Sequence, residues 1–136
     1  MKILITPQQD IYGMARIGWV DPTGDKGIEV YVHTNDGGRT AHFHVRKYGG
    51  HGQFEWECCI EYKSAKYFKH GKYQDELPDR KTAKQLDKML RSVNKSSRFG
   101  TTYWQDAIDE WNRNNSVDIL PLDLEQPDYS KIVSDD

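Results

Sequence analysis

Two short segments with alternating side chains flank a compact turn sequence, and this pattern constrains the fold more than any other. In residues 28–34, three aliphatic side chains alternate with polar, aromatic or charged ones. Residues 41–46 alternate in the same way around a central Phe43. The Asn-Asp-Gly-Gly sequence at 35–38 is typical of a hairpin turn. The chain is therefore expected to contain a β-hairpin with one apolar and one polar face.

The pairing of this hairpin decides which side chains share a face. A two-residue loop pairs Val30 with Phe43 and keeps every apolar side chain on one side. A three-residue loop would place Val32 beside His42 and mix the two faces. Because register is specified where one face is buried, we predict the two-residue loop. The other face then carries Glu29, Tyr31, His33, His42, His44 and Arg46.

Further alternating segments predict more strands, and two helices follow them. The predicted strands cover residues 2–6, 16–20, 28–34, 41–46 and 54–62. If the last strand pairs beside 41–46, Glu55, Glu57 and Cys59 join the histidine face. Strands followed by helices indicate an α+β fold. We expect an antiparallel sheet of about four or five strands with two C-terminal helices packed on one face.

The two helices are predicted from capping residues and apolar spacing. Leu77-Pro78-Asp79 begins the first helix, with the proline in its first turn or Asp79 as its cap. Thr102 and Gln105 form the capping-box pattern of the second. The apolar stripe of the first helix is Ala83, Leu86, Met89, Leu90 and Val93, and that of the second is Trp104, Ala107, Ile108 and Trp111.

The charges divide the chain into a domain and a tail. Residues 116–136 carry six acidic residues and one basic residue, whereas residues 63–98 carry eleven basic and four acidic residues. We therefore predict a single α+β domain over 1–115 and an acidic, partly apolar tail over 116–136. The tail is expected to dock on the domain or on a protein partner, and its candidate partner-binding residues are Ile119, Leu120, Leu122 and Leu124.

The composition also argues against several classes of protein. No apolar run approaches the ~20 residues of a membrane span, and the first residues lack the pattern of a signal peptide. Adjacent strand residues point to opposite faces, so Cys58 and Cys59 cannot readily form a disulfide with each other. We therefore expect reduced thiols, no membrane partner and a cytoplasmic location, in a bacterium or an infected host cell.

One stretch resembles a known family. His42-Phe43-His44-Val45, then Leu77-Pro78-Asp79-Arg80 at a helix start and Trp111 in a second helix, are similar to a family of small bacterial domains of unknown function. The hallmark of that family is a Pro-Pro-His-Phe-His-Val strand, and its members are often suggested to be toxin–antitoxin-like. The resemblance covers residues 28–113, with Thr40-Ala41 in place of the two prolines. It implies a compact α+β fold and no particular chemistry.

The histidine face is a candidate metal or catalytic site. Histidines two apart on a strand point the same way, as metal ligands or an acid–base pair would require. In this interpretation His33, His42, His44 and Glu29 bind a divalent metal such as zinc or manganese. Catalysis would use His42 and His44 with Glu57 as ligand or base. A polar sheet face with His–Glu cross-strand pairs is favoured over this site, because a flat face lacks the concavity of most sites.

Two alternatives remain for the other features. Cys59 shares the histidine face and could pair with a histidine, although a structural thiol is expected. The basic segment 63–91 could bind nucleic acid, because lysines interleaved with aromatic residues suit phosphates and stacked bases. Its candidate nucleic-acid-binding residues are Lys63, Lys66, Lys69, Lys72, Lys84, Lys88 and Arg91.

The leading hypothesis from the sequence is a non-enzymatic protein-interaction module, encoded by a bacterium, mobile element or phage. It would bind a protein partner or a second copy of itself, without a cofactor. The charge asymmetry and the acidic, apolar tail motivate it. The alternatives are a metal-dependent hydrolase or nuclease and a nucleic-acid binder.

Overall fold

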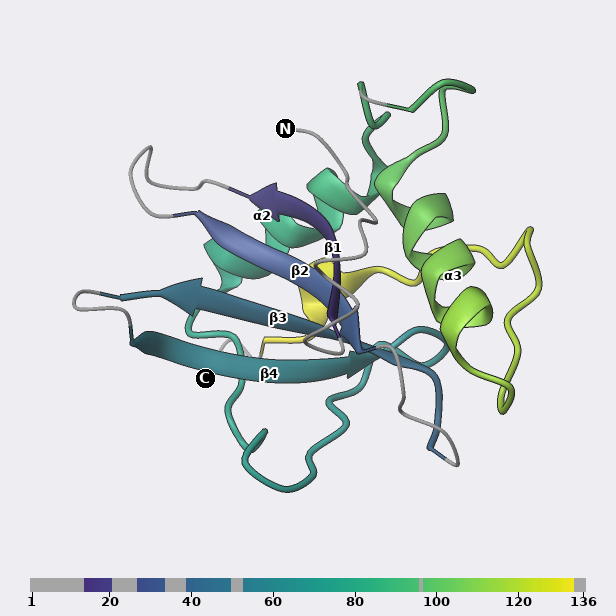
Figure 1. The fold of residues 1–136 in the computed structure, drawn as a ribbon. Helices are drawn as coiled ribbons and strands as arrows, with labels where there is room; N and C mark the ends of the chain where they lie inside the picture. The colour runs from purple at the N-terminus through teal and green to yellow at the C-terminus, as the bar shows by residue number, and fades with distance from the viewer. Residues whose placement is uncertain (1–13, 21–26, 34–38, 50–52, 96, 134–136) are drawn as a thin grey trace.

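The chain folds into one antiparallel sheet with two helices on one side of it (Figure 1). The computed structural model describes residues 14–20, 27–33, 39–49, 53–95 and 97–133, with the backbone alone for 14–20. The strands are β1 (Met14–Val20), β2 (Ile28–His33), β3 (His42–Tyr48) and β4 (Phe54–Glu61), paired in the order β1-β2-β3-β4. The predicted α+β class is confirmed. The strand predicted at 2–6 and the turn at 35–38 lie outside the described residues.

The hairpin register differs from the prediction while the faces agree with it. Val30 pairs with Val45, and the predicted pairing of Val30 with Phe43 is wrong. The shift equals two residues, which is one full side-chain repeat of a strand. Because such a shift moves no side chain to the other face, the apolar pattern alone could not exclude it. Val30, Phe43 and Val45 all remain buried on the core face.

Both helices begin where their capping residues predict. In α2 (Arg80–Arg91) the Asp79 side chain accepts a hydrogen bond from the Thr82 N–H. In α3 (Tyr103–Asn114) Thr102 and Gln105 make both bonds of the capping box. The stripe predicted for the first helix is wrong at Val93, which is 56% exposed. The reason is that the helix ends at Arg91, and Val93 instead forms a β-bridge with Thr102.

The core lies between the sheet and the helices. The Tyr62 hydroxyl donates a hydrogen bond to the Ala107 carbonyl of α3 at 2.8 Å, and Trp104 and Trp111 are buried as predicted. The C-terminal segment, yellow in Figure 1, runs from α3 back behind the sheet. It ends in a short 3-10 helix, η2 (Tyr129–Lys131), which packs against α2.

Candidate metal centre

Three histidines and a cysteine converge on the sheet face opposite the apolar residues of β2 and β3, with the His42 ring 5.6 Å from the Trp111 ring of α3, centre to centre. His42 and His44 come from β3, Cys59 lies directly opposite His44 on β4, and His70 comes from the segment that follows β4. One ligand atom from each of the four lies within 4.8 Å of the others. We call these four residues the His–Cys cluster. His42, His44 and Cys59 are buried, and His70 is partly buried.

Two sulfur–nitrogen distances inside the His–Cys cluster can be compared with those of a tetrahedral metal site. Cys59 Sγ lies 3.1 Å from His44 Nδ1 and 3.5 Å from His70 Nε2. Zinc bonds of about 2.3 Å to sulfur and about 2.05 Å to nitrogen place tetrahedral S and N ligands about 3.5 Å apart. The Cys59–His70 separation matches that spacing, and the Cys59–His44 separation is about 0.4 Å shorter.

The backbone orients one of these imidazoles as a metal ligand would be oriented. His42 Nδ1 lies 2.7 Å from the Thr40 carbonyl oxygen. A carbonyl can only accept, so Nδ1 carries the proton and Nε2 is the basic nitrogen. Metal-binding histidines characteristically donate their second nitrogen to a carbonyl or carboxylate in this way, which fixes the tautomer.

Residues 62–77 cover the histidine face, and we call them the covering segment. The Phe68 N–H donates to the Cys59 carbonyl at 2.9 Å, and the Phe68 ring stacks on His42. The Tyr73 hydroxyl lies 3.2 Å from His33 Nε2. The face is therefore an interior layer, contrary to the flat, open surface on which the sequence interpretation relied.

A tight turn places His70 over the sheet. His70 and Tyr73 exchange two backbone hydrogen bonds across Gly71 and Lys72. Gly71 has a φ of +52°, a conformation that glycine adopts without steric cost. The Arg39 guanidinium contacts His70 Nδ1 from the exposed side. An arginine can only donate, so this contact keeps Nδ1 unprotonated and places the ring proton on Nε2, towards Cys59.

The structure brings together only some of the residues predicted for this site. His42 and His44 are in the cluster, and the His33 ring lies 4.3 Å from the His44 ring, centre to centre. Glu29 instead forms a buried ion pair with Arg46 at 2.6 Å. Glu57 accepts a hydrogen bond from the Tyr31 hydroxyl. Neither carboxylate belongs to the His–Cys cluster.

Sequence reasoning missed His70 and did not count Cys59 as a metal ligand. Alternation already placed Cys59 on the histidine face, so its signal was present. His70 had no periodic signal, and only the His-Gly-Lys-Tyr turn could have indicated that the chain reverses there. Cys58 and Cys59 are both free thiols. Cys58 points into the core, where burial raises the pKa of its thiol above the usual range.

The predicted nucleic-acid residues do not form one surface. Lys63 pairs with Asp118, Lys69 with Glu76 and Arg91 with Asp87. Lys66, Lys69 and Lys72 lie on the covering segment, whereas Lys84, Lys88 and Arg91 lie on α2. The set therefore divides between a loop and a helix.

The tail residues predicted to bind a partner have different environments. Leu120 is 2% exposed and belongs to the core of its own chain, whereas Ile119 and Leu122 are 52% and 74% exposed. Leu124 is partly buried against the same core.

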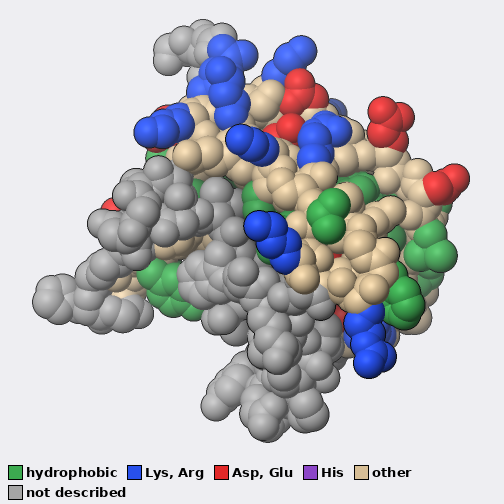
Figure 2. Space-filling model, turned by 90° about the horizontal axis from the view of Figure 1, so that it is seen from above, with side chains coloured by type: hydrophobic (Ala, Val, Ile, Leu, Met, Phe, Trp, Pro, Cys, Tyr) green, Lys and Arg blue, Asp and Glu red, His purple; other side chains and the backbone are tan. Residues whose placement is uncertain are grey.

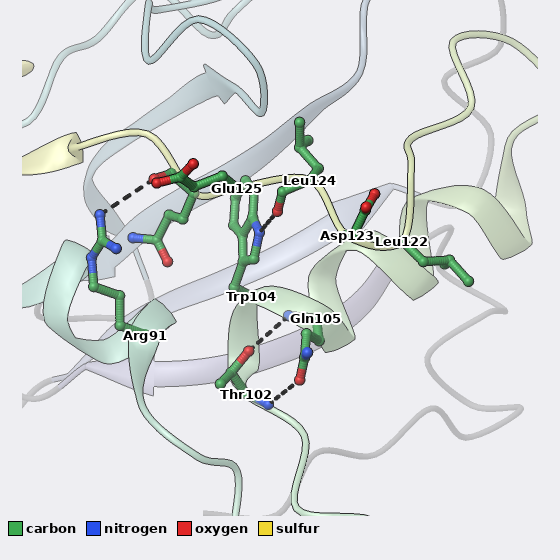
Figure 3. A pocket seen from close by; sticks show the side chains of 9 residues that line it. Arg91, Thr102, Trp104, Gln105, Leu122, Asp123, Leu124 and Glu125 are labelled. Atoms are coloured by element: carbon green, nitrogen blue, oxygen red, sulfur yellow. Dashed lines mark hydrogen bonds between the residues drawn. The ribbon is translucent and has the colours of Figure 1, made fainter.

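A surface pocket of about 510 Å³ lies where the tail crosses the two helices (Figure 3). The Trp104 indole N–H donates to the Leu124 carbonyl at 2.7 Å, and Thr102 and Gln105 bond to each other through the capping box. These polar groups are hydrogen-bonded within the chain. We therefore interpret the pocket as a gap left where the tail packs on the helices, and not as a binding site.

Comparison with family models, curated proteins and solved structures gives no match to this chain. The resemblance to the bacterial His-Phe-His-Val family therefore stays a prediction. No helix among the described residues has the length and apolar character to span a membrane.

Proposed function

We propose that this protein binds one divalent transition-metal ion at His42, His44, Cys59 and His70. Their imidazole and thiolate groups make zinc the expected ion. The observation that carries this proposal is the convergence of four nitrogen and sulfur ligand atoms within 4.8 Å of one another. Imidazole and thiolate ligands favour zinc, copper, nickel or cobalt over magnesium, calcium or manganese.

The ligand set supports a metal-holding role rather than catalysis. Structural zinc sites use four protein ligands, whereas catalytic sites use three and keep a position for water. With all four residues bound, the ion has no open position, which favours the leading, non-enzymatic hypothesis over the hydrolase alternative. The ion would fasten the covering segment to the sheet, because His70 lies on that segment and the other three ligands lie on strands. A reducing cytoplasm would keep Cys59 competent to bind.

The first experiment is metal analysis and titration of the purified, reduced protein. We expect one zinc per chain, and excess zinc at 100 times Kd should raise stability by about 2.7 kcal/mol. For a chain of 136 residues this corresponds to a rise in Tm of roughly 9 °C. Cobalt substitution should give the absorption spectrum of a tetrahedral ion with a thiolate ligand.

Variants separate the proposed site from adventitious binding. His70→Gln should lose the stoichiometric metal and still fold, because His70 is only partly buried and lies outside the strands. Cys58→Ala is the matched control, since this neighbouring cysteine faces the core and should bind metal normally. Wild-type protein that takes up no zinc, nickel or cobalt and melts identically with and without them would end the proposal.

Hydrogen exchange tests the fastening role directly. Chelation should accelerate exchange of the Phe68 and Tyr73 amides, which bond within the covering segment or to Cys59, and should leave α2 and α3 amides unchanged.

The Arg39→Gln variant should bind zinc more tightly than the wild type. His70 Nε2 can coordinate only when Nδ1 carries the proton and the Arg39 contact is broken. Equal affinity in the variant would show that His70 is not a ligand through Nε2.

A further inference from the structure

Helix α2 carries an unusual accumulation of positive charge. Its first turn contains Arg80 and Lys81 and no acidic residue. The positive end of the helix dipole lies there, so acidic residues are favoured and basic ones are disfavoured. The capping carboxylate of Asp79 suits the dipole, but Arg80 and Lys81 carry charge of the sign that it disfavours.

The repulsion continues along the exposed side of the helix. Lys81, Lys84 and Lys88 are all exposed and follow one another at three- and four-residue spacing. Like charges at this spacing destabilise a helix by a few tenths of a kcal/mol each. Asp87, the helix's acidic residue, pairs with Arg91. Among the described residues, no acidic side chain forms an ion pair with these three lysines. Departures from local rules are expected at functional or strained sites, so the exposed face of α2 is a candidate binding surface.

An exposed aromatic residue follows at the end of the helix. Phe99 is 86% exposed at the tip of the connection between α2 and α3. The connection is held in place, because the Asn94 N–H donates to the Thr101 carbonyl and the Ser97 N–H donates to the Asn94 carbonyl. Lys95 and Arg98, both exposed, flank the tip. This loop therefore presents a large apolar ring to solvent among positive charges.

We propose that α2 and this loop bind single-stranded nucleic acid. Lys81, Lys84 and Lys88 would contact phosphates, and Phe99 would stack on a base. We call this surface the basic ridge, formed by Lys81, Lys84, Lys88, Lys95, Arg98 and Phe99. Figure 2 shows several Lys and Arg side chains along the upper edge of the molecule seen from above, with Asp and Glu side chains among them. The proposal is independent of the metal site, which lies on the other face of the sheet.

The dimensions and charge suit a short strand. With a rise of about 1.5 Å per residue, Lys81 to Lys88 span about 10 Å along α2, which corresponds to roughly three phosphates at the spacing of one duplex strand. Within residues 116–133, the tail's hydrogen bonds to α2 go to Arg91 and Asp87, and none goes to Lys81, Lys84 or Lys88. Positive grooves with exposed aromatic rings are characteristic of proteins that bind single strands without sequence preference.

The test is fluorescence anisotropy with labelled twelve-nucleotide dT and U oligomers, in a salt series, on the full chain purified with its metal. We expect binding that weakens with salt, with a log–log slope of about −0.7 for each phosphate contact. Lys84→Gln/Lys88→Gln should reduce that slope by about 1.4. Phe99→Ala should weaken binding about 5- to 150-fold and leave any binding to duplex of equal length unchanged.

A control variant separates the basic ridge from general charge. Lys66→Gln/Lys69→Gln also removes two positive charges, but from the covering segment. This variant should leave the affinity for the oligomers nearly unchanged. Equal losses in the two double variants would overturn the proposal, as would the absence of binding at low salt. Binding to anionic phospholipid vesicles with none to oligomers would also overturn it, because the partner would then be a membrane surface.

Discussion

Tyr129 tests whether the acidic tail is part of the folded domain. Its ring is fully buried and packs edge-on against Phe43, with centroids 5.5 Å apart. Its hydroxyl lies 3.1 Å from the Glu61 carbonyl and 2.9 Å from the Tyr62 carbonyl, to which it donates. Burial raises the pKa of Tyr129 above the usual range, so the hydroxyl stays protonated and remains a donor.

Two substitutions of Tyr129 give different expected losses. Tyr129→Phe removes the hydrogen bond and keeps the ring, which should cost about 1–2 kcal/mol. Tyr129→Ala also removes the ring and leaves a cavity, which should cost about 3–5 kcal/mol. At roughly 3.5 °C per kcal/mol for 136 residues, the Tm should fall by about 5 °C and about 10–17 °C, respectively.

Thermal melting followed by circular dichroism measures both losses. Leu122→Ala is the control, because Leu122 is 74% exposed in the same tail and its truncation should change stability by less than about 0.5 kcal/mol. If Tyr129→Ala melts within about 2 °C of the wild type, the tail contributes nothing to the core and the packing argument fails.

Two further predictions concern polar contacts. Hydrogen bonds from the Ala41 N–H and then from Lys63 lower the pKa of Asp118 below the usual value. Its stabilisation is thus present above the ordinary aspartate pKa and lost as pH falls through the lower folded pKa. Asp118→Asn, which tolerates the local φ of +56°, should be less stable at pH 7 and should approach the wild type in acid melts. Thr102→Ala removes the capping box with Gln105 and should cost about 1 kcal/mol in urea unfolding, with an unchanged m-value; no change in midpoint would refute the capping argument.

The sequence predicts those parts of this fold that depend on short-range rules. Capping residues gave both helix starts, because Asp79 and Thr102 act within three residues of themselves. The alternation of apolar and polar side chains correctly predicted which residues of β2 and β3 share a face. The register was wrong because a two-residue shift leaves the apolar pattern intact, and only the geometry of the turn distinguishes the two pairings.

In the candidate site too, the residues on strands could be predicted from local patterns, whereas the residue on an irregular segment could not. His42, His44 and Cys59 could be placed on one face from alternation alone. His70 reaches that face by a chain reversal, and no periodicity predicts where an irregular segment will lie. The sequence predicted that Leu120 docks on the domain or on a partner, and only the fold shows that the buried contact is with its own chain.

The His–Cys cluster is buried between the sheet and the covering segment, and the energetic cost of this burial explains why a bound metal ion would stabilise the protein. Burying imidazoles and a thiol removes their hydration, which costs about 1–3 kcal/mol for each polar group that is not fully compensated. Phe68 and Tyr73 of the covering segment pack on these histidines, while six of its residues 62–77 are lysines or acids that add no apolar burial. Zinc binds structural sites of zinc-finger peptides with an apparent free energy of about 10–16 kcal/mol, and the stabilisation it gives depends on its free concentration relative to Kd. One ion could therefore stabilise a polar interface that hydrophobic burial alone would hold only weakly, and it would do so by joining the covering segment to β3 and β4.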